Sequence, residues 1–179
     1  MAFIETLLRR QPGETVQLEP SFCVVTDGPG HTVFDHCGVS EIKDKTKAII
    51  IFDHDIPAGS FESAGIQKEL IRISRAGEIP FVQSQGIGYQ VMIDGYVKAG
   101  DIILSCGEHN SVYGAVGALG LDVSVEELAA ALKTGALTFT VPETAVVHLT
   151  GSLPSDVTCK DFMLRRLTGL PATSVYPKP

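Results

Sequence analysis

Two apolar runs, each followed by a carboxylate beside a histidine, constrain the fold of this chain more than any other feature. The run at 49–52 leads directly into Asp53 and His54, and the run at 101–105 leads into the polar turn at 107–110. Short isoleucine-rich runs bounded by turn residues are typical of buried strands. A strand that ends in ionisable side chains places them at the rim of the core, where a substrate can reach them.

Helix signals lie between these runs. Ser60 can cap a helix whose apolar residues recur at helical spacing until Gly77, which stands where a C-terminal cap belongs. Residues 124–127 form a capping-box pattern, which predicts a second helix that ends at Gly135. Strands that alternate with helices predict the α/β class with a largely parallel sheet.

The rest of the chain is expected to continue this alternation. We expect strands at 22–25, 47–52, 79–82, 101–105 and 144–150, a short amphipathic helix at 1–10 and a last helix from 158 to 169. The small-residue segment after the second pair is predicted to be a helix, in which Gly114, Gly117 and Gly120 allow close packing on the sheet. We expect one domain over 1–169 and a proline-rich tail or linker at 170–179.

Composition and charge exclude several classes of protein. The formal net charge of −7 argues against a surface for nucleic acid or for an anionic membrane, and no apolar run approaches the ~20 residues of a membrane span. The start of the chain lacks a signal-peptide pattern, so we expect a cytoplasmic protein. Disulfides, and a zinc or iron–sulfur site built from this chain's own cysteines, are not expected, because Cys23, Cys37, Cys106 and Cys159 are far apart and form no C-x-x-C pair.

Several polar loops are predicted to meet at one place. Each of the following directly succeeds a predicted strand: Asp27, Asp53-His54, Gln85 and Glu108-His109. The carboxyl ends of parallel strands lie along one edge of a sheet, and ligands bind in the crevices at that edge. The sequence therefore predicts a single site to which these four loops contribute.

The residues at this edge allow more than one chemistry. A carboxylate that orients an imidazole makes a positioned proton donor or acceptor. Alternatively, His54, His109 and a carboxylate could hold a single metal ion. Free N–H groups in the turn at 110–112 would favour a carboxylate or phosphate group of a ligand. An Asp-His pair after a strand can also be a simple loop-stabilising turn.

An ordered series of motifs resembles one known family. Residues 85–90 are similar to a G-I-x-H-Q segment, and 99–103 to a P-G-x-x-I strand entry. Residues 106–119 resemble a G-D-S-H-T motif followed by G-A-x-G-A-L. Asp53-His54 with Pro57 resembles a D-H-x-x-P strand end, and the loop at 27–33, which contains His31, is a weaker match. In this order the motifs resemble the large-subunit catalytic core of the aconitase and 3-isopropylmalate dehydratase family.

The resemblance implies a three-layer α/β/α domain that dehydrates and hydrates hydroxy di- or tricarboxylic acids, with a [4Fe-4S] cluster as Lewis acid. The candidate catalytic residues are Asp53, His54, Glu108 and His109. The candidate substrate-binding residues are Asp27, His31, Gln85, Tyr89, Asn110 and Ser111.

Departures from the family pattern define two hypotheses. Tyr89 stands where the family has histidine, Glu108 replaces the aspartate, and the serine between the acid and His109 is missing. The cluster's cysteine ligands and the substrate-clamping arginines belong to the part of the family's large subunit that this chain does not match. The first hypothesis is a hydro-lyase or isomerase domain whose cluster and arginines come from a complementary C-terminal or small-subunit chain. The second is a catalytically degenerate relative that binds a carboxylate or a partner subunit, and homo-oligomers are expected in either case.

Overall fold

The computed structural model describes residues 3–107, 109–144, 148 and 150–167. Contacts divide the chain into a larger unit, residues 15–139, and a smaller one made of residues 1–14 and 140–179, and each is described by itself. The expected single domain over 1–169 stays a prediction. None of the helices in the described ranges is both long and apolar enough to cross a bilayer.

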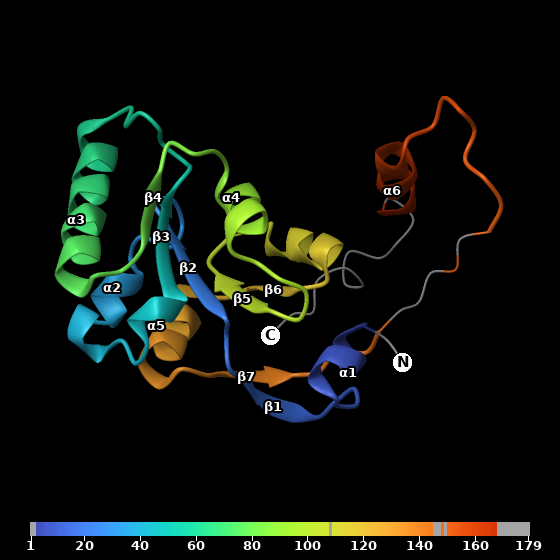
Figure 1. The fold of residues 1–179 in the computed structure, drawn as a ribbon, viewed down its shortest axis with the longest axis horizontal. Coiled ribbons are helices and arrows are strands. Elements are labelled where there is room, and N and C mark those ends of the chain that lie inside the picture. Colours follow the sequence, from blue (N-terminus) through green and yellow to red (C-terminus); the bar gives the residue numbers. More distant parts are fainter. Residues whose placement is uncertain (1–2, 108, 145–147, 149, 168–179) are drawn as a thin grey trace. The chain divides into compact units, whose positions relative to one another are not determined.

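A five-stranded sheet forms the centre of the larger unit (Figure 1). Its strands lie in the order β4 (Phe81–Gln83), β3 (Ala48–Phe52), β2 (Phe22–Thr26), β5 (Ile102–Ser105) and β6 (Leu119–Asp122). Each neighbouring pair is parallel. The predicted parallel α/β sheet is confirmed, and its register places Val24 of β2 between Ile49 and Ser105.

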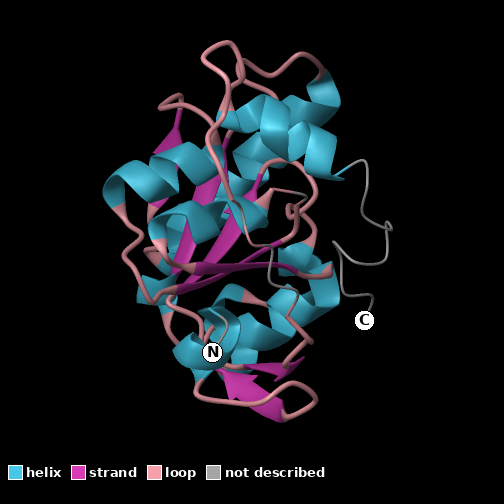
Figure 2. Ribbon diagram, turned by 90° about the vertical axis from the view of Figure 1, so that its right-hand side faces the viewer, coloured by secondary structure: helices cyan, strands magenta, loops and turns pink. Residues whose placement is uncertain are grey.

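Helices cover both faces of this sheet, as the predicted α/β/α class requires, and in Figure 2 the strands run between helices. One face packs under α4 (Gly88–Gly95) and the 3-10 helix η3 (Asn110–Val116), with Met92 and Tyr113 fully buried against it. The opposite face packs against α3 (Phe61–Gly77) and α5 (Val125–Thr134), and α2 (Val33–His36) packs against α5. Successive strand residues point to opposite faces, so the continuous apolar runs fill both layers.

The two predicted capping signals act as expected. The Ser60 hydroxyl accepts the N–H of Ser63 at 3.0 Å at the start of α3, and the Ser124 hydroxyl accepts the N–H of Glu127 at 3.2 Å at the start of α5. Gly135 ends α5 in the left-handed conformation, with a φ of 77°. At the end of α3 the residue in the left-handed conformation is Glu78 (φ 55°), one residue after Gly77, where the sequence predicted the C-terminal cap.

The glycine-rich segment differs from the prediction of one helix. It forms η3, which Gly117 ends at a φ of 77°, and the chain then enters strand β6. Gly120 therefore lies in a strand, where its backbone passes directly beside the Asn110 carbonyl group. The regular spacing of small residues suggested a helix, whereas the structure requires glycine at two of these positions for other reasons. Gly117 takes the left-handed conformation that ends η3, and Gly120 allows the close crossing of β6.

Short elements complete the structure. The remaining parts of the larger unit are the 3-10 helices η1 (Val39–Glu41) and η2 (Lys45–Lys47), and a two-stranded sheet of β1 (Thr15–Leu18) and β7 (Leu137–Thr140) that sequence patterns did not indicate. In the smaller unit the predicted terminal helices appear as α1 (Phe3–Leu8) and α6 (Cys159–Leu167). Most of the strand expected at 144–150 and the whole tail at 170–179 lie outside the described residues, and Thr144, His148 and Thr150 are not in a strand.

The close approach at Gly120 gives a stability test. A Cβ at Gly120 would overlap the Asn110 carbonyl, whereas a Cβ at Gly114 meets no atom within 4 Å. We expect Gly120→Ala to lower the free energy of unfolding by about 1–3 kcal/mol and Gly114→Ala to leave it nearly unchanged, as measured by urea denaturation. Equal stability of the two variants would contradict this packing.

Candidate functional site

A pocket lies where the order of the strands changes direction. From β2 the chain builds outward through β3 and β4, then returns to the other side of β2 with β5 and β6. Such a switch point leaves a crevice at the carboxyl ends of the two central strands. The cavity here has a volume of about 230 Å³ and is lined by Val24, Thr26, Pro29, Asp53, His54, Gly88, Tyr89, Ser105, Cys106, Gly107, His109, Asn110 and Tyr113.

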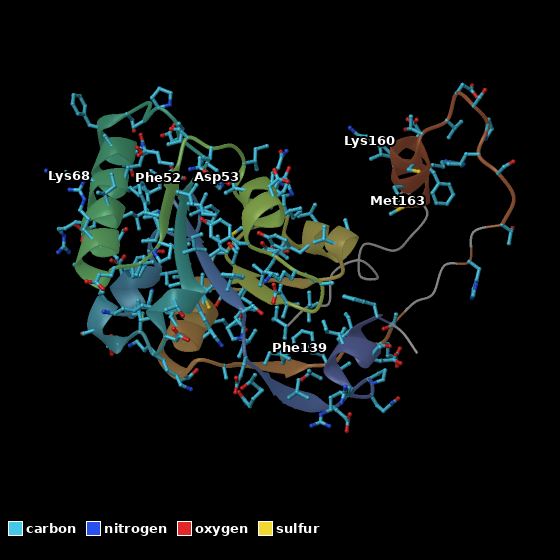
Figure 3. The ribbon with its side chains drawn as sticks, viewed as in Figure 1. Phe52, Asp53, Lys68, Phe139, Lys160 and Met163 are labelled. Carbon is cyan, nitrogen blue, oxygen red and sulfur yellow. The ribbon has the colours of Figure 1, made fainter. Side chains whose placement is uncertain are left out.

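Asp53 and His54 form a hydrogen-bonded pair in this pocket. Asp53 follows β3 directly, beside Phe52 (Figure 3). The Nδ1 of His54 lies 2.6 Å from Oδ1 of Asp53. A carboxylate only accepts, so Nδ1 carries the proton that it donates. The Asp53 side chain is 9% exposed and that of His54 49%, so the pair has a buried anchor and an accessible ring. The Nε2 of His54 makes no hydrogen bond with the described residues and is the atom available for proton transfer.

The second oxygen of Asp53 is held by the start of a helix. Oδ2 accepts the N–H of Gly88, the first residue of α4, at 2.7 Å. A side chain at Gly88 would place Cβ 2.6 Å from this oxygen, so only glycine allows the approach. The partial positive charge at a helix N-terminus stabilises a carboxylate. Asp53 is therefore fixed at both oxygens and cannot rotate without losing a bond.

Asp27 anchors the loop that carries this pair. Its Oδ1 accepts the backbone N–H groups of Asp53 at 2.9 Å and His54 at 3.1 Å. Its Oδ2 accepts from the N–H of Asp55 at 3.4 Å and from Nε2 of Gln67 at 3.0 Å. Burial alone would raise the pKa of Asp27, but these four hydrogen bonds outweigh it and hold the pKa below its ordinary value.

The same three side chains resemble a metal site, but their oxygens are occupied. One ligand atom from each of Asp27, Asp53 and His54 lies within 4.8 Å of the others. The donors described above already use both oxygens of each carboxylate and the Nδ1 of the histidine. A cation would have to displace several of these N–H groups. The arrangement therefore fits proton transfer better than metal binding.

The rings of Tyr89, His109 and Tyr113 also line the pocket. The rings of Tyr89 and His109 meet edge to face, with centroids 6.1 Å apart. Tyr113 is 1% exposed, and its burial, with a smaller contribution from the charge of Asp53, raises the pKa of its phenol. Tyr113 is thus held in the protonated form beside the Asp53 carboxylate.

Asn110 connects the strands beneath the pocket. Its Nδ2 donates to the carbonyl groups of Ser105 at 3.2 Å and Leu121 at 3.4 Å and to Oδ1 of Asp122 at 2.7 Å. These bonds join β5, β6 and η3 and fix the turn that carries His109. The N–H of Asn110 lies 3.4 Å from Asp122 Oδ1 and that of Val112 bonds to the His109 carbonyl group, so part of the expected set of free N–H groups is in use.

Comparison with known proteins assigns the family. The model of the aconitase family (aconitate hydratase) matches residues 38–175. The chain belongs to the aconitase family. Its matches include 3-isopropylmalate dehydratase large subunit 2 of Methanopyrus kandleri, 34% identical over 86% of this chain, and the large subunit of Saccharolobus solfataricus, 31% identical over 87%. Mitochondrial homoaconitase of Candida albicans is 30% identical over 85% of the chain. The chain spans 40%, 39% and 23% of these three relatives, respectively.

The pocket of this aconitase-family domain unites some of the candidate residues. It contains Asp53, His54, Tyr89, His109 and Asn110. Asp27 lies behind it, and its contacts are those of a positioning residue. Ser111 and Gln85 are exposed and do not line the cavity, and His31 donates from Nδ1 to the Gly28 carbonyl group at 2.7 Å. Glu108 lies outside the described residues. The roles assigned to all of these side chains stay predictions.

The described cysteines do not suit the [4Fe-4S] cluster that the family resemblance implies. Cys23, Cys37 and Cys106 are buried, and Cys159 is exposed in the smaller unit. No cysteine joins the metal-ligand group found among the described residues. Burial raises the pKa of the Cys23 thiol to about 12 and that of Cys106 to about 11, which keeps them protonated. No step of a reaction is therefore assigned here to a cluster held by these thiols.

Sequence patterns missed two residues that support the pair, Gly88 and Gln67, and one that lines the pocket, Thr26. Gly88 was placed within a motif without a role, and Gln67 and Thr26 were not singled out at all. Thr26 directly precedes Asp27, so its place at a strand end was the available signal. Gln67 carried a weaker one, because an amide on the apolar face of a helix needs partners in the core.

The Thr26 hydroxyl offers a test of this pocket. It is buried and has no hydrogen-bond partner among the described residues. Replacing it by an isosteric methyl removes a desolvation cost, so Thr26→Val is expected to raise the free energy of unfolding by about 1 kcal/mol. The control is Thr138→Val in β7, which loses the bond from Gln17 Nε2 (2.8 Å) and should gain nothing. A destabilised Thr26→Val protein would mean that the hydroxyl has a partner in solution.

The lowered pKa of Asp27 leads us to expect that its contribution to the free energy of unfolding depends on pH. Its pKa is lowered in the folded state, so its contribution is present above its unfolded pKa of about 3.9 and is lost as the pH falls through the lower folded value. At neutral pH we expect Asp27→Asn to cost about 1.5–3 kcal/mol, the range for hydrogen bonds to a charged group. The gap to wild type, measured by urea denaturation, should narrow below about pH 4. The exposed Asp35→Asn control should show no such gap.

Proposed function

We propose that this chain is a hydro-lyase or isomerase domain that acts on a hydroxy di- or tricarboxylic acid. The observation that carries the proposal is the Asp53–His54 pair, fixed by four backbone N–H groups and opening into the switch-point pocket. Membership of the aconitase family supports the reaction class. The names of the relatives add two examples, dehydration of 3-isopropylmalate and the homoaconitase reaction.

In the proposed dehydration, His54 is the general acid. In the acid form of the ring both nitrogens carry a proton, and the one on Nε2 passes to the leaving hydroxyl oxygen as the carbon–oxygen bond breaks and water departs. A base takes the proton from the adjacent carbon, whose electron pair forms the double bond. His109, which also lines the pocket, is the candidate for this base together with Glu108. Asp53 holds the His54 ring in the required orientation and stabilises its protonated form.

We further propose that a companion polypeptide completes the site. No lysine or arginine lines the described pocket, whereas a di- or tricarboxylate needs cations to bind it. The net charge of −7 gives no long-range attraction for such a substrate. Two relatives are named large subunits, which supports a small-subunit or C-terminal partner as the source of arginines and of the iron–sulfur cluster.

The test is purification of the chain with whatever accompanies it from its native cells, followed by assays on hydroxy di- and tricarboxylic acids that include 3-isopropylmalate. We expect hydration and dehydration activity in a complex that contains iron and sulfide. His54→Ala should lower the rate by a factor of about 10²–10⁴, the usual contribution of a general acid. The control His36→Ala replaces an exposed histidine on α2 and should keep full activity.

Other results would select the alternatives. A complex without iron, sulfide or turnover that still binds the carboxylic acids would favour the degenerate binding module, for which the altered Tyr89 and Glu108 positions argue. Stoichiometric zinc, iron or manganese without sulfide would favour the single-metal site. Sedimentation of the same samples tests the expected homo-oligomer, which a clean monomer would contradict.

A further inference from the structure

A buried glutamine completes the hydrogen-bond network behind the Asp53–His54 pair. Gln67 lies on α3 and is 8% exposed, although glutamine is mostly found at the surface. Its Nε2 donates to Oδ2 of Asp27 at 3.0 Å and to the carbonyl group of Asp55 at 2.7 Å. A carboxylate and a carbonyl group only accept, so the chemistry of the two partners requires the NH₂ end of the amide to face them.

These two bonds complete the hydrogen-bond network around the loop at 53–55. Asp27 holds the loop by the N–H groups of Asp53, His54 and Asp55, and Gln67 holds both Asp27 and the far end of the same loop. Gln67 thereby ties the loop after β3 to the buried side of α3. Among the described residues it is the one side chain that donates a hydrogen bond to the Asp27 carboxylate.

We propose that Gln67 is a positioning residue that sets the orientation of the His54 ring through Asp27 and the loop at 53–55. The inference rests on the proposed role of His54 as the proton-transfer group. A neutral amide suits this role better than a lysine or arginine would, because it orients Asp27 without neutralising it. The Asp27 carboxylate therefore keeps its negative charge. Its Oδ1 lies 3.9 Å from Nδ1 of His54, close enough to attract the imidazole ring when the ring carries a positive charge.

The first test compares Gln67→Met with Lys68→Met, the same substitution one residue further along α3. Lys68 is exposed and extends away from the sheet (Figure 3). In NMR spectra of the full chain, we expect Gln67→Met to accelerate hydrogen exchange of the amides of Asp53, His54 and Asp55 about tenfold relative to that of Leu104 in β5, because the variant loses both hydrogen bonds of the Gln67 amide. The signal of the His54 Nδ1 proton should broaden. Lys68→Met should match wild type.

Gln67→Glu supplies a second variant with a distinct signature. At neutral pH its carboxylate would face that of Asp27, with Asp53 and Asp55 nearby, so the loop should be disturbed more than in Gln67→Met. On acidification the new carboxyl group gains a proton and can donate to Asp27, and the exchange rates should return toward those of wild type at the same pH. The Gln67→Met defect should not recover, because methionine has no donor.

Two outcomes would overturn the assignment. The first is a Gln67→Met protein in which the exchange rates of the three loop amides and the His54 Nδ1 proton signal are the same as in wild type. The second is faster hydrogen exchange at all amides, that of Leu104 included, which would mean that Gln67 contributes only to the general stability of the core. In the active complex a positioning role predicts a lower kcat with little change in KM. Altered loop amides in a chain that shows no turnover would support the role of Gln67 while contradicting the proposed hydro-lyase activity, so the two failures are distinguishable.

Discussion

This site depends on one interaction: the buried carboxylate of Asp27 accepts hydrogen bonds from three successive backbone N–H groups. Asp27 ends the central strand β2, and the amides that it binds begin the loop after the neighbouring strand β3. An uncompensated charge in this position would be costly, but four donors satisfy it. The carboxylate thus converts a strand end, where the chain is usually mobile, into a rigid support for His54.

Sheet topology explains why the pocket lies beside this support. Because β5 joins β2 on the side away from β3, the loops after β2 and β5 diverge and leave a cavity between them. The start of α4 and the turn before η3 close its sides with Gly88, Tyr89 and His109. The pocket supplies a proton-transfer group and the buried, protonated phenol of Tyr113 but no described lysine or arginine, which is why a domain of this kind is proposed to work with a partner.

Local signals predicted the larger elements well. The isoleucine-rich strand before Asp53 and the helices capped by Ser60 and Ser124 depend on short-range rules, namely burial of continuous apolar runs and capping of free N–H groups. The prediction at Gly114–Gly120 was wrong in part, because small residues at regular spacing suit both a packed helix and a turn that enters a strand. Only the position of the Asn110 carbonyl group shows that Gly120 has no room for a side chain.

The sequence by itself determined the α/β class, the family pattern and the presence of Asp53 and His54 at a strand end, since each of these depends on residues that are near neighbours in the chain. The tertiary structure alone decided which side chains support the pair. Asp27, Gln67 and Gly88 come from three separate elements, and their bonds to residues 53–55 exist only after the sheet and helices have packed. It also decided that Asp27 faces backbone donors rather than the cavity, because the direction of a side chain depends on the atoms that surround it.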